Sequence, residues 1–449
     1  MQPVLQSASE ERVVQSPALL QEVAARYALE QLQQVIRLAS LATTALVVAL
    51  PLYSRNFNAS GTETGLLFAI PAFTAAIARP IIGRSMDRIG RKPFLVAATV
   101  LMLIAMLTFA AAREFTVSLG GMVWQADARF AVNMLFAART LQGFALGVLL
   151  LSSYTMTADL ARQAGRGSSF GYTEEAQYRG GILGGLIALP VLLLLGFNVQ
   201  GELIITQDVW TAVFSLFSLG TLISAIWAVQ RVPETRQWAL AQAEPLELSR
   251  TIDPQLFRLM AIVTLTMASS YGLSPFILVY INDRLTQNLI FIVLAYLPAA
   301  LIWAFLPSRL GRIADRVGRK PPIVIGLSIS GLFSLTIPFL AVLSPNPALA
   351  IGVLMVFATL EAACYSAAVP AEQALVADMT GGKHRGTGFG LYTLAQSVGQ
   401  IIGPVAMGAL YDIDHSGPFI ANAVILALGS VLVLTLLRDP VKQRASRAA

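Results

Sequence analysis

Charged residues are scarce in this chain. They make up 12% of its 449 residues, whereas soluble domains usually carry about 25%. Apolar residues reach 56%. So few charges could not cover so large an apolar surface in water, and the composition therefore excludes an ordinary soluble protein. The basic residues are also dispersed among short segments, which argues against a nucleic-acid-binding protein.

Cysteine and histidine are nearly absent too. The single cysteine, Cys364, cannot form an internal disulfide, and the two histidines, His384 and His415, stand alone in the sequence. Because no spacing typical of a metal site occurs, we expect neither a metal nor a cofactor. The chain lacks the G-x-x-x-x-G-K-[ST] loop that binds nucleotide phosphates, so we expect neither an ATP-driven pump nor an enzyme. It also lacks the pattern of a cleavable signal peptide.

Long apolar segments, by contrast, recur along the whole chain. Several reach the length of about 20 residues that spans a bilayer. They predict twelve helices, near residues 33–53, 63–82, 94–112, 131–158, 168–196, 209–230, 256–281, 288–308, 322–343, 347–377, 387–410 and 417–437. We therefore expect an all-α polytopic membrane protein.

The basic residues sort to one side of these predicted helices. Of the 31 Lys and Arg residues, 24 lie on the side of the N-terminus and four on the other. Basic loops remain in the cytoplasm during membrane insertion. We therefore expect an integral protein of the cell membrane, in contact with the lipid bilayer, with both termini in the cytoplasm.

The chain also repeats itself. The segment GRSMDRIGRKP at 83–93 recurs as GRIADRVGRKP at 311–321, with eight of eleven positions identical. A second match pairs residues 159–184 with residues 378–403 at a constant offset of 219. Such internal repeats are typical of transporters, so we predict that the twelve helices form two pseudo-symmetric six-helix bundles.

A polar stretch after the sixth predicted helix separates the two bundles. The predicted parts are an N-terminal cytoplasmic segment, a first bundle, a cytoplasmic linker, a second bundle and a cytoplasmic tail, at 1–32, 33–231, 232–254, 255–438 and 439–449. Pro17 suits the first turn of a helix that begins before the first predicted span. That helix either lies at the membrane interface or simply extends the first span.

Each copy of the repeated motif holds one acidic residue, Asp87 or Asp315, among several cations. Membrane topology and lipid headgroups require the cations but not the acid, which suggests that the acid has a specific partner. The first glycine of each copy, Gly83 or Gly311, permits close backbone approach, and the second permits a tight turn.

The pattern G-x-x-x-D-R-x-G-R-K between the second and third helices, and again between the eighth and ninth, resembles the signature of the major facilitator superfamily. The segment ARTLQGFALG in the fourth helix is similar to a pattern of its drug/proton antiporter branches. The resemblance covers nearly the whole chain. It implies two bundles that rock about a central site and open it to each side in turn, in a protein that works as a monomer.

The resemblance also implies contacts that close the cytoplasmic side. Asp87 would reach the start of the eleventh helix near residues 386–387, and by pseudo-symmetry Asp315 would reach the start of the fifth helix near residues 167–168. The unpaired N–H groups and the dipole of a helix N-terminus stabilise a carboxylate, so these placements are physically reasonable.

Two ion pairs complete the expected gate. Arg91 would pair with Asp159, and Arg319 with Asp378. Our hypothesis is that all these contacts hold the outward-facing state. The full set of expected gating residues is Gly83, Asp87, Arg88, Arg91, Asp159, Gly311, Asp315, Arg316, Arg319 and Asp378.

Acidic residues inside spanning helices are costly and usually functional. Glu361 lies about 25 Å from the cytoplasmic end of the tenth helix, at the repeat position of Gln142, and is our first candidate for a proton-carrying acid. Its alternative role is a hydrogen bond within the bundle. Glu175 and Glu174 come next and lie about 6–10 Å into the fifth helix, within reach of cytoplasmic water. Glu175 could instead pair with Arg179, four residues later.

Aromatic and polar residues on the helices that face the central cavity in this family are candidates for its wall. They are Arg139, Gln142, Arg179, Tyr271, Trp303, Tyr365, Tyr392 and Gln396. Arg179 could bind an anionic substrate if it does not pair with Glu175. For each aromatic residue, plain packing is the alternative.

Two features depart from the antiporter pattern. The first helix carries no acid between Arg37 and Arg55, and Gly185 stands where the fifth helix should have proline.

We expect a secondary transporter that exports small amphiphilic compounds and is driven by protons. Proton-coupled uptake of a polar metabolite or sugar-like solute is the alternative, which the V-P-E-T-R sequence at 232–236 weakly favours. A non-transporting sensor of the same fold is the third possibility.

Overall fold

The structure, a computed structural model, describes most of the chain. The described residues are 17–42, 46, 50, 53–54, 57–58, 61–119, 122–161, 165–195, 206–238, 254–284, 298–343, 346–380 and 384–438.

The N-terminal half consists of long helices, with a short two-stranded antiparallel ribbon inserted between two of them. Its elements are α1 (Pro17–Ala39), α3 (Gly61–Ile89), α4 (Lys92–Ala110), β1 (Phe115–Leu119), β2 (Met122–Ala126), α5 (Ala128–Leu160), α6 (Arg166–Leu195) and α7 (Gln207–Arg231).

The C-terminal half repeats this helical plan. Its elements are α10 (Pro254–Arg284), α12 (Pro307–Val317), α13 (Lys320–Leu343), α14 (Pro347–Met379), α15 (Arg385–Ile413) and α16 (Gly417–Leu436). Residues 298–305, directly before α12, are helical as well.

Polar capping residues and prolines define where several helices begin. The Asp127 side chain accepts a hydrogen bond from the Phe130 backbone N–H at 2.9 Å at the start of α5, and Asn346 does the same for Ala348 at 3.0 Å at the start of α14. Pro93 and Pro321 lie in the first turns of α4 and α13, as the sequence predicts.

Seven of the described helical segments are long and apolar enough to span a bilayer. Ten of the twelve expected helices are described over nearly all of their predicted ranges, whereas those at 33–53 and 288–308 are described only in part. The other long helices are α1, α3, α6 and α15, and the last three carry charged and glycine-rich motifs. The prediction of an all-α membrane protein is confirmed.

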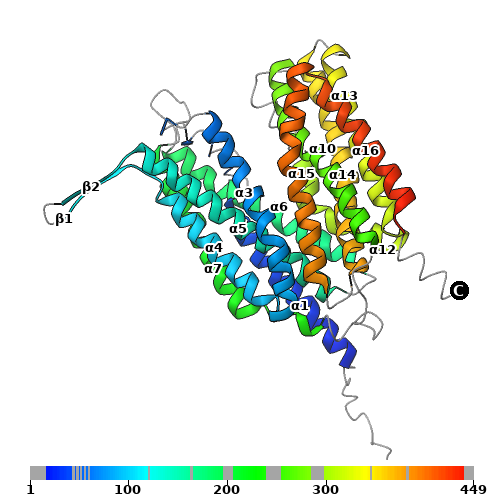
Figure 1. The fold of residues 1–449 in the computed structure, drawn as a ribbon, viewed down its shortest axis with the longest axis horizontal. Coiled ribbons are helices and arrows are strands. Elements are labelled where there is room, and N and C mark those ends of the chain that lie inside the picture. The colour runs from blue at the N-terminus through cyan, green and yellow to red at the C-terminus, as the bar shows by residue number, and fades with distance from the viewer. Residues whose placement is uncertain are drawn as a thin grey trace, which may run out of the picture.

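The two halves meet at one end of the molecule and diverge at the other (Figure 1). At the joined end α3 packs against α15, and α6 packs against α12 and α14. Both copies of the repeated motif lie at this end, which we call the motif end. The opposite end, where the halves diverge, we call the open end.

Apolar packing follows the same division. One buried cluster joins residues of both halves near the motif end, including Leu151 of α5 and Leu375 of α14. Separate clusters fill the remainder of each half. The contact between the halves is therefore built as a packed core.

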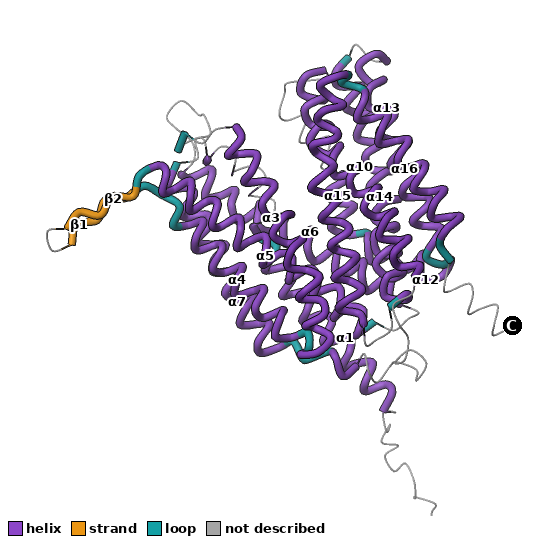
Figure 2. Tube along the Cα trace, in the orientation of Figure 1, coloured by secondary structure: helices purple, strands orange, loops and turns teal. Residues whose placement is uncertain are grey.

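Two details differ from the sequence prediction. The repeated motif is mostly helical, because α3 continues to Ile89 and α12 to Val317, and only the turn that follows each helix is irregular. In these turns Gly90 has φ +126° and Gly318 has φ +102°, as a tight turn requires. The ribbon β1–β2 was not predicted (Figure 2). Helix α1 runs unbroken from Pro17 to Ala39 into the range of the first predicted span, in line with one of the two alternatives that the sequence left open.

Candidate functional site

Two aspartates join the halves at the motif end. The Asp87 carboxylate, on α3, accepts hydrogen bonds from the Gly386 and Thr387 backbone N–H groups at 2.9 Å each, and from the Thr387 hydroxyl at 2.6 Å. Both residues, Gly386 and Thr387, belong to the first turn of α15 in the other half. The predicted placement of Asp87 is confirmed, and a helix N-terminus is its partner.

The second aspartate makes the pseudo-symmetric contact. The Asp315 carboxylate, on α12, accepts hydrogen bonds from the backbone N–H groups of Gly167 at 2.8 Å and Ser168 at 3.0 Å, at the start of α6. This prediction is confirmed too. Each half therefore contributes one carboxylate, which accepts hydrogen bonds, and one helix N-terminus, which donates them to the carboxylate of the other half.

Glycines allow the backbones to come this close. A Cβ atom on Gly83 would lie 2.4 Å from the Gly386 carbonyl oxygen, and one on Gly311 would lie 2.3 Å from the Gly167 carbonyl oxygen. Such distances are far below ordinary contact, so any side chain there would force the helices apart. The first glycine of each motif thus has the role expected from the sequence.

A buried ion network surrounds the Asp87 contact. The Arg91 Nε atom donates to Asp159 at 3.0 Å, as predicted, and Arg385 of the other half donates to the same carboxylate at 3.1 Å. All three side chains are almost fully buried. Breaking a buried pair by removing one partner typically costs about 3–5 kcal/mol, because the other charge is left uncompensated.

The equivalent network surrounds the Asp315 contact. Arg319 donates to Asp378 at 3.2 Å, as predicted, and Arg166 of the other half donates to it at 2.5 Å. Burial would lower the pKa of the Arg319 guanidinium, but the carboxylates of Asp378 and Asp315 outweigh burial and raise that pKa above its usual value.

Sequence reasoning missed the two arginines that cross between the halves. Arg166 and Arg385 are identical residues at the constant repeat offset of 219, and this pairing was the available signal. Two other expected gating residues, Arg88 and Arg316, are instead exposed at the surface. The Arg88 carbonyl oxygen accepts a hydrogen bond from Arg236, which follows α7.

The V-P-E-T-R segment lies directly against the first motif. The Glu234 carboxylate accepts hydrogen bonds from the backbone N–H groups of Arg91 at 2.9 Å and Lys92 at 3.0 Å, at the start of α4. The Thr235 hydroxyl donates to Asp159 at 3.1 Å. The segment therefore supports the turn of the motif.

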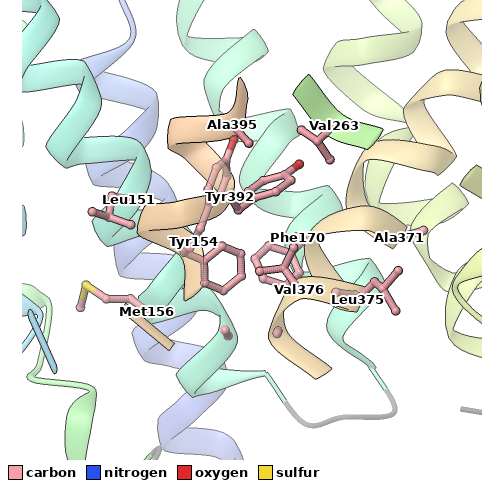
Figure 3. Packing of buried hydrophobic residues seen from close by; sticks show 14 of the residues in the cluster. Leu151, Tyr154, Met156, Phe170, Val263, Ala371, Leu375, Val376, Tyr392 and Ala395 are labelled. Atoms are coloured by element: carbon pink, nitrogen blue, oxygen red, sulfur yellow. The ribbon is translucent and has the colours of Figure 1, made fainter. Parts of the chain in front are cut away.

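Aromatic rings fill the contact just inside the ion networks. Phe170 of α6 and Phe389 of α15 lie 5.6 Å apart between ring centroids and occupy the same position in the two repeats. Repeat-equivalent residues that touch each other must lie near the pseudo-two-fold axis. Tyr154 and Tyr392 pack beside them, and Figure 3 shows Tyr154, Phe170 and Tyr392 gathered at this point. We call these four rings the aromatic seal.

Tyr392 was expected in the wall of the central cavity. It is 1% exposed and belongs to the aromatic seal, where its hydroxyl donates to Glu372 at 2.7 Å. Gln396, also expected in the wall, donates to the Tyr392 hydroxyl at 3.0 Å. The expectation for Tyr392 is wrong for this state, because the two halves meet around its ring.

Glu174 connects the two halves. Its carboxylate accepts hydrogen bonds from the Tyr154 hydroxyl at 3.1 Å and from the Gln373 side chain of α14 at 2.6 Å. Sequence reasoning did not single out Gln373, which carries no repeat or motif signal. The expectation that Glu174 and Glu175 lie within reach of cytoplasmic water is wrong here, because both are buried between the halves.

Glu175 and Arg179 form the intrahelical pair considered above, at 2.7 Å. The other oxygen of Glu175 accepts from the Ser308 backbone N–H at 2.8 Å, at the start of α12. Arg179 also donates to the Ala304 carbonyl oxygen at 2.7 Å, and its guanidinium lies 5.0 Å from the centre of the Phe305 ring. The pair therefore binds the opposite half through both of its members.

Glu361 has a simpler environment. It lies on α14, where the Ser330 hydroxyl of α13 donates to its carboxylate at 2.5 Å. Both residues belong to the C-terminal half. This hydrogen bond within the bundle is the contact that the sequence offered as the alternative role of Glu361.

Arg139 and Gln142 are brought together within the N-terminal half. Arg139 donates to the Gln142 side chain and to the Leu67 carbonyl oxygen of α3, both at 2.6 Å.

Arg79 is a further buried arginine on α3, and it reaches α15 through the Thr393 carbonyl oxygen at 2.7 Å and the Ser397 hydroxyl. Its position inside a predicted spanning helix was the signal for it, but no partner could be predicted.

Three aromatic side chains lie beyond the seal, toward the open end. The Trp303 ring lies 5.0 Å from the ring of Tyr178 of the other half, tilted against it, and 6.0 Å from the Tyr365 ring. Tyr271 is 48% exposed on α10. Of the expected aromatic wall residues, Trp303 and Tyr365 are thus in contact, and Tyr271 presents a free surface.

Comparison with known proteins agrees with this architecture. The family model described as Major Facilitator Superfamily matches residues 36–358 and 348–449. A multi-drug resistance efflux pump PmrA homolog of Lactococcus lactis is 26% identical and covers 80% of this chain and 82% of its own. Multidrug resistance protein 1 of Bacillus subtilis is 24% identical, covering 86% and 90%.

A solved structure shows the same fold. The crystal structure of the human organic anion transporter MFSD10 (TETRAN) superimposes with a TM-score of 0.69, covering 91% of this chain and 99% of that one, at 15% identity.

Proposed function

Because the chain belongs to the Major Facilitator Superfamily, we propose that it is a proton-coupled exporter of small amphiphilic compounds. The names of the relatives described above, a multi-drug resistance efflux pump homolog and a multidrug resistance protein, support export of drugs. The proposal places the protein in the cell membrane with both termini and the motif end in the cytoplasm, as the basic residues indicate.

The observation that carries the proposal is the pair of pseudo-symmetric contacts at the motif end. Asp87 and Asp315 each bind a helix N-terminus of the opposite half, while the halves diverge at the open end (Figure 1). In the proposed orientation this is the outward-facing state, with the cytoplasmic gate closed. We define that gate as the two aspartate contacts, the two ion networks and the aromatic seal.

Transport requires that the gate open and the far ends of the bundles come together. The gate contacts are numerous but separable, since they are hydrogen bonds, ion pairs and ring contacts between helices and none of them is covalent. Substrate would be released at the open end and bound again after the gate opens to the cytoplasm. Alternating access of this kind moves the two bundles about a fixed central site.

We propose Glu361 as the proton-coupling acid. Its hydrogen-bond partner is the neutral Ser330, so no ion pair must break when the carboxyl group gains or loses a proton. Glu175 is less suited, because its two oxygens are committed to Arg179 and to the start of α12. We assign Glu175 a structural role in the contact between the halves. Glu174 is the second candidate for the coupling acid, since its contact with Gln373 would link protonation to that interface.

The substrate site would lie between the seal and the open end. Trp303 and Tyr365 from one half and Tyr178 from the other provide a group of aromatic rings in contact there, and Tyr271 is exposed on α10. Aromatic surfaces of this kind suit amphiphilic ligands of variable shape.

The test is gradient-driven transport in proteoliposomes. An imposed pH gradient should move a fluorescent amphiphilic cation, and a protonophore should abolish the movement. Glu361→Gln should lose the response to the gradient but still exchange dye across the membrane without it. Glu114→Gln, an exposed carboxylate beyond α4, is the matched control and should behave as the wild type.

Two results would change the proposal. Gradient-driven movement that persists in Glu361→Gln but is lost in Glu174→Gln would transfer the coupling role to Glu174. Absence of movement with every amphiphile tried, together with gradient-driven uptake of a polar solute, would overturn the exporter.

A further inference from the structure

The ribbon β1–β2 is the one described element that leaves the body of the protein. Its strands, Phe115–Leu119 and Met122–Ala126, pair antiparallel between α4 and α5. Figures 1 and 2 show it projecting sideways from the open end of the N-terminal half, across the direction of the helices rather than along it. An isolated two-stranded hairpin is at best marginally stable in water, so this one needs a surface to lie on.

The register divides the ribbon into two chemically different faces. Phe115 pairs with Ala126. Because successive residues of a strand alternate between the two faces, the pairs Val117–Trp124 and Leu119–Met122 lie on the same face as Phe115 and Ala126. The residues on this face are all apolar: Phe115, Val117, Leu119, Met122, Trp124 and Ala126. The residues on the opposite face are Thr116, Ser118, Val123 and Gln125.

One ring contact shows which way the apolar face turns. The Phe115 ring lies 5.9 Å from the Phe130 ring in an edge-to-face arrangement. Phe130 belongs to the first turn of α5, where that helix enters the span. The face that carries Phe115 therefore points toward α5 and the helical body, and the polar face points away from that body.

Apolar side chains are also exposed on the helix that leads into the ribbon. On α4, which leads into the ribbon, Val100, Ile104 and Leu107 are between 41% and 52% exposed and follow one another at helical spacing. Charged residues mark the base of the ribbon, with Arg113 and Glu114 before β1 and Asp127 after β2. The ribbon thus begins where the apolar helix surface gives way to water.

We propose that the ribbon lies on the membrane surface, with its apolar face in the interfacial region of the leaflet at the open end. Trp124 and Phe115 are the residue types that concentrate at the boundary between lipid and water. The lipid surface provides the apolar cover that an isolated hairpin lacks. The ribbon then fixes the depth and tilt of the N-terminal bundle while the other bundle moves.

Spin labels on paired strand positions test the proposal. Single cysteines at 117 and 124 place nitroxides on the apolar face, and cysteines at 116 and 125 are their matched controls on the polar face. In a cysteine-free background reconstituted into phospholipid vesicles, we expect the 117 and 124 labels to collide with oxygen rather than with a water-soluble nickel chelate. The 116 and 125 labels should show the reverse preference.

Each remaining outcome would overturn the proposal. Equal nickel accessibility on both faces would mean that the ribbon stands in water. Protection of the apolar face combined with dipolar coupling between labels on different molecules would mean that a second copy covers it. The assay contains only the full-length protein and lipid, so protection by an unidentified protein cannot produce the expected result. Transport by Thr116→Cys and Gln125→Cys monitors folding of the labelled chains.

Discussion

At the scale of single residues, the distance between the two halves depends on glycines at the helix crossings. The Gly83 and Gly311 crossings bring backbone against backbone, so that the neighbouring aspartates reach N–H groups directly. A methyl group at either position would push against a carbonyl oxygen, which belongs to a rigid helix and cannot rotate away. Overpacking of this kind typically costs about 1–3 kcal/mol.

We therefore predict that Gly83→Ala opens the motif end. The added Cβ atom would lie 2.4 Å from the Gly386 carbonyl oxygen, and separating α3 from α15 relieves that clash. Double electron–electron resonance between spin labels at 89 and 317 measures the opening. Ile89 and Val317 are repeat-equivalent, exposed by 66% and 46%, and lie at the ends of α3 and α12 in opposite halves. The distance distribution should shift toward longer values.

Gly185→Ala is the control for this substitution. A Cβ atom there would meet nothing within 4 Å, although the residue is also a helical glycine in the N-terminal half. It should leave the 89–317 distances unchanged. If Gly83→Ala leaves them unchanged as well, the crossing does not limit how closely the halves meet.

Sequence alone could identify those parts of the gate that the repeat and the motif mark. The family resemblance that the motif carries implied the contact of Asp87 with the start of α15 and the Arg91–Asp159 pair, and the structure confirms both contacts. It could not identify Gln373 as the partner of Glu174, because that contact depends on how α6 and α14 face each other. It placed Tyr392 in the cavity wall, since helix membership does not indicate depth relative to the seal.

At the scale of elements, each half of the gate is a carboxylate on one helix end and the N-terminus of another helix. A carboxylate at a helix N-terminus contributes about 0.3–1 kcal/mol when exposed and up to about 2 kcal/mol when partly buried. The Asp87 and Asp315 side chains are largely buried, which favours the upper part of this range. Helices α15 and α6 are thereby held against α3 and α12.

We predict that Asp87→Asn and Asp315→Asn each weaken the closed gate by about 1–2 kcal/mol, which is a population shift of about 5- to 30-fold. Asparagine keeps the shape but loses the charge that the helix N-terminus stabilises. The 89–317 distance distribution should gain a longer component in each variant. The double variant should gain more than either, because the two contacts are separate.

Asp208→Asn provides the matched control. Asp208 also lies in the first turn of a helix, α7, but it is 84% exposed and at the other end of the molecule. It should not alter the 89–317 distances. Unchanged distances in Asp87→Asn would show that the carboxylate does not hold the gate closed.

The elements differ in how well the sequence predicted them. Apolar runs of bilayer length locate the helices, because a spanning segment must satisfy its own backbone hydrogen bonds. The ribbon β1–β2 escaped prediction, since its five-residue strands are shorter than any span and lie between two strong helical signals.

At the scale of the whole molecule, the two halves touch at one end and diverge at the other. The pseudo-two-fold axis passes near the contact between Phe170 and Phe389, since these residues are repeat-equivalent and touch each other. Rocking of the halves that opens the motif end must separate residues near this axis and bring the far ends together. The aromatic seal is therefore the place where a covalent link would oppose the motion most directly.

We predict that cross-linking this pair stops transport. In a cysteine-free background, Phe170→Cys/Phe389→Cys would be treated with a short bifunctional methanethiosulfonate. Transport should fall to the rate of protein-free vesicles and should recover on reduction, because the link keeps the motif end closed. The treated protein should still bind an amphiphilic dye added on the side of the open end.

The comparison that decides this prediction is within one variant, before and after cross-linking, so the loss of two aromatic rings does not affect it. Each single-cysteine variant, treated with the same reagent, should keep its untreated rate. Undiminished transport by the cross-linked protein would mean that the halves move without separating at their axis, which contradicts alternating access through this gate. Loss of transport that reduction reverses would show that the contact seen between Phe170 and Phe389 must break in every cycle.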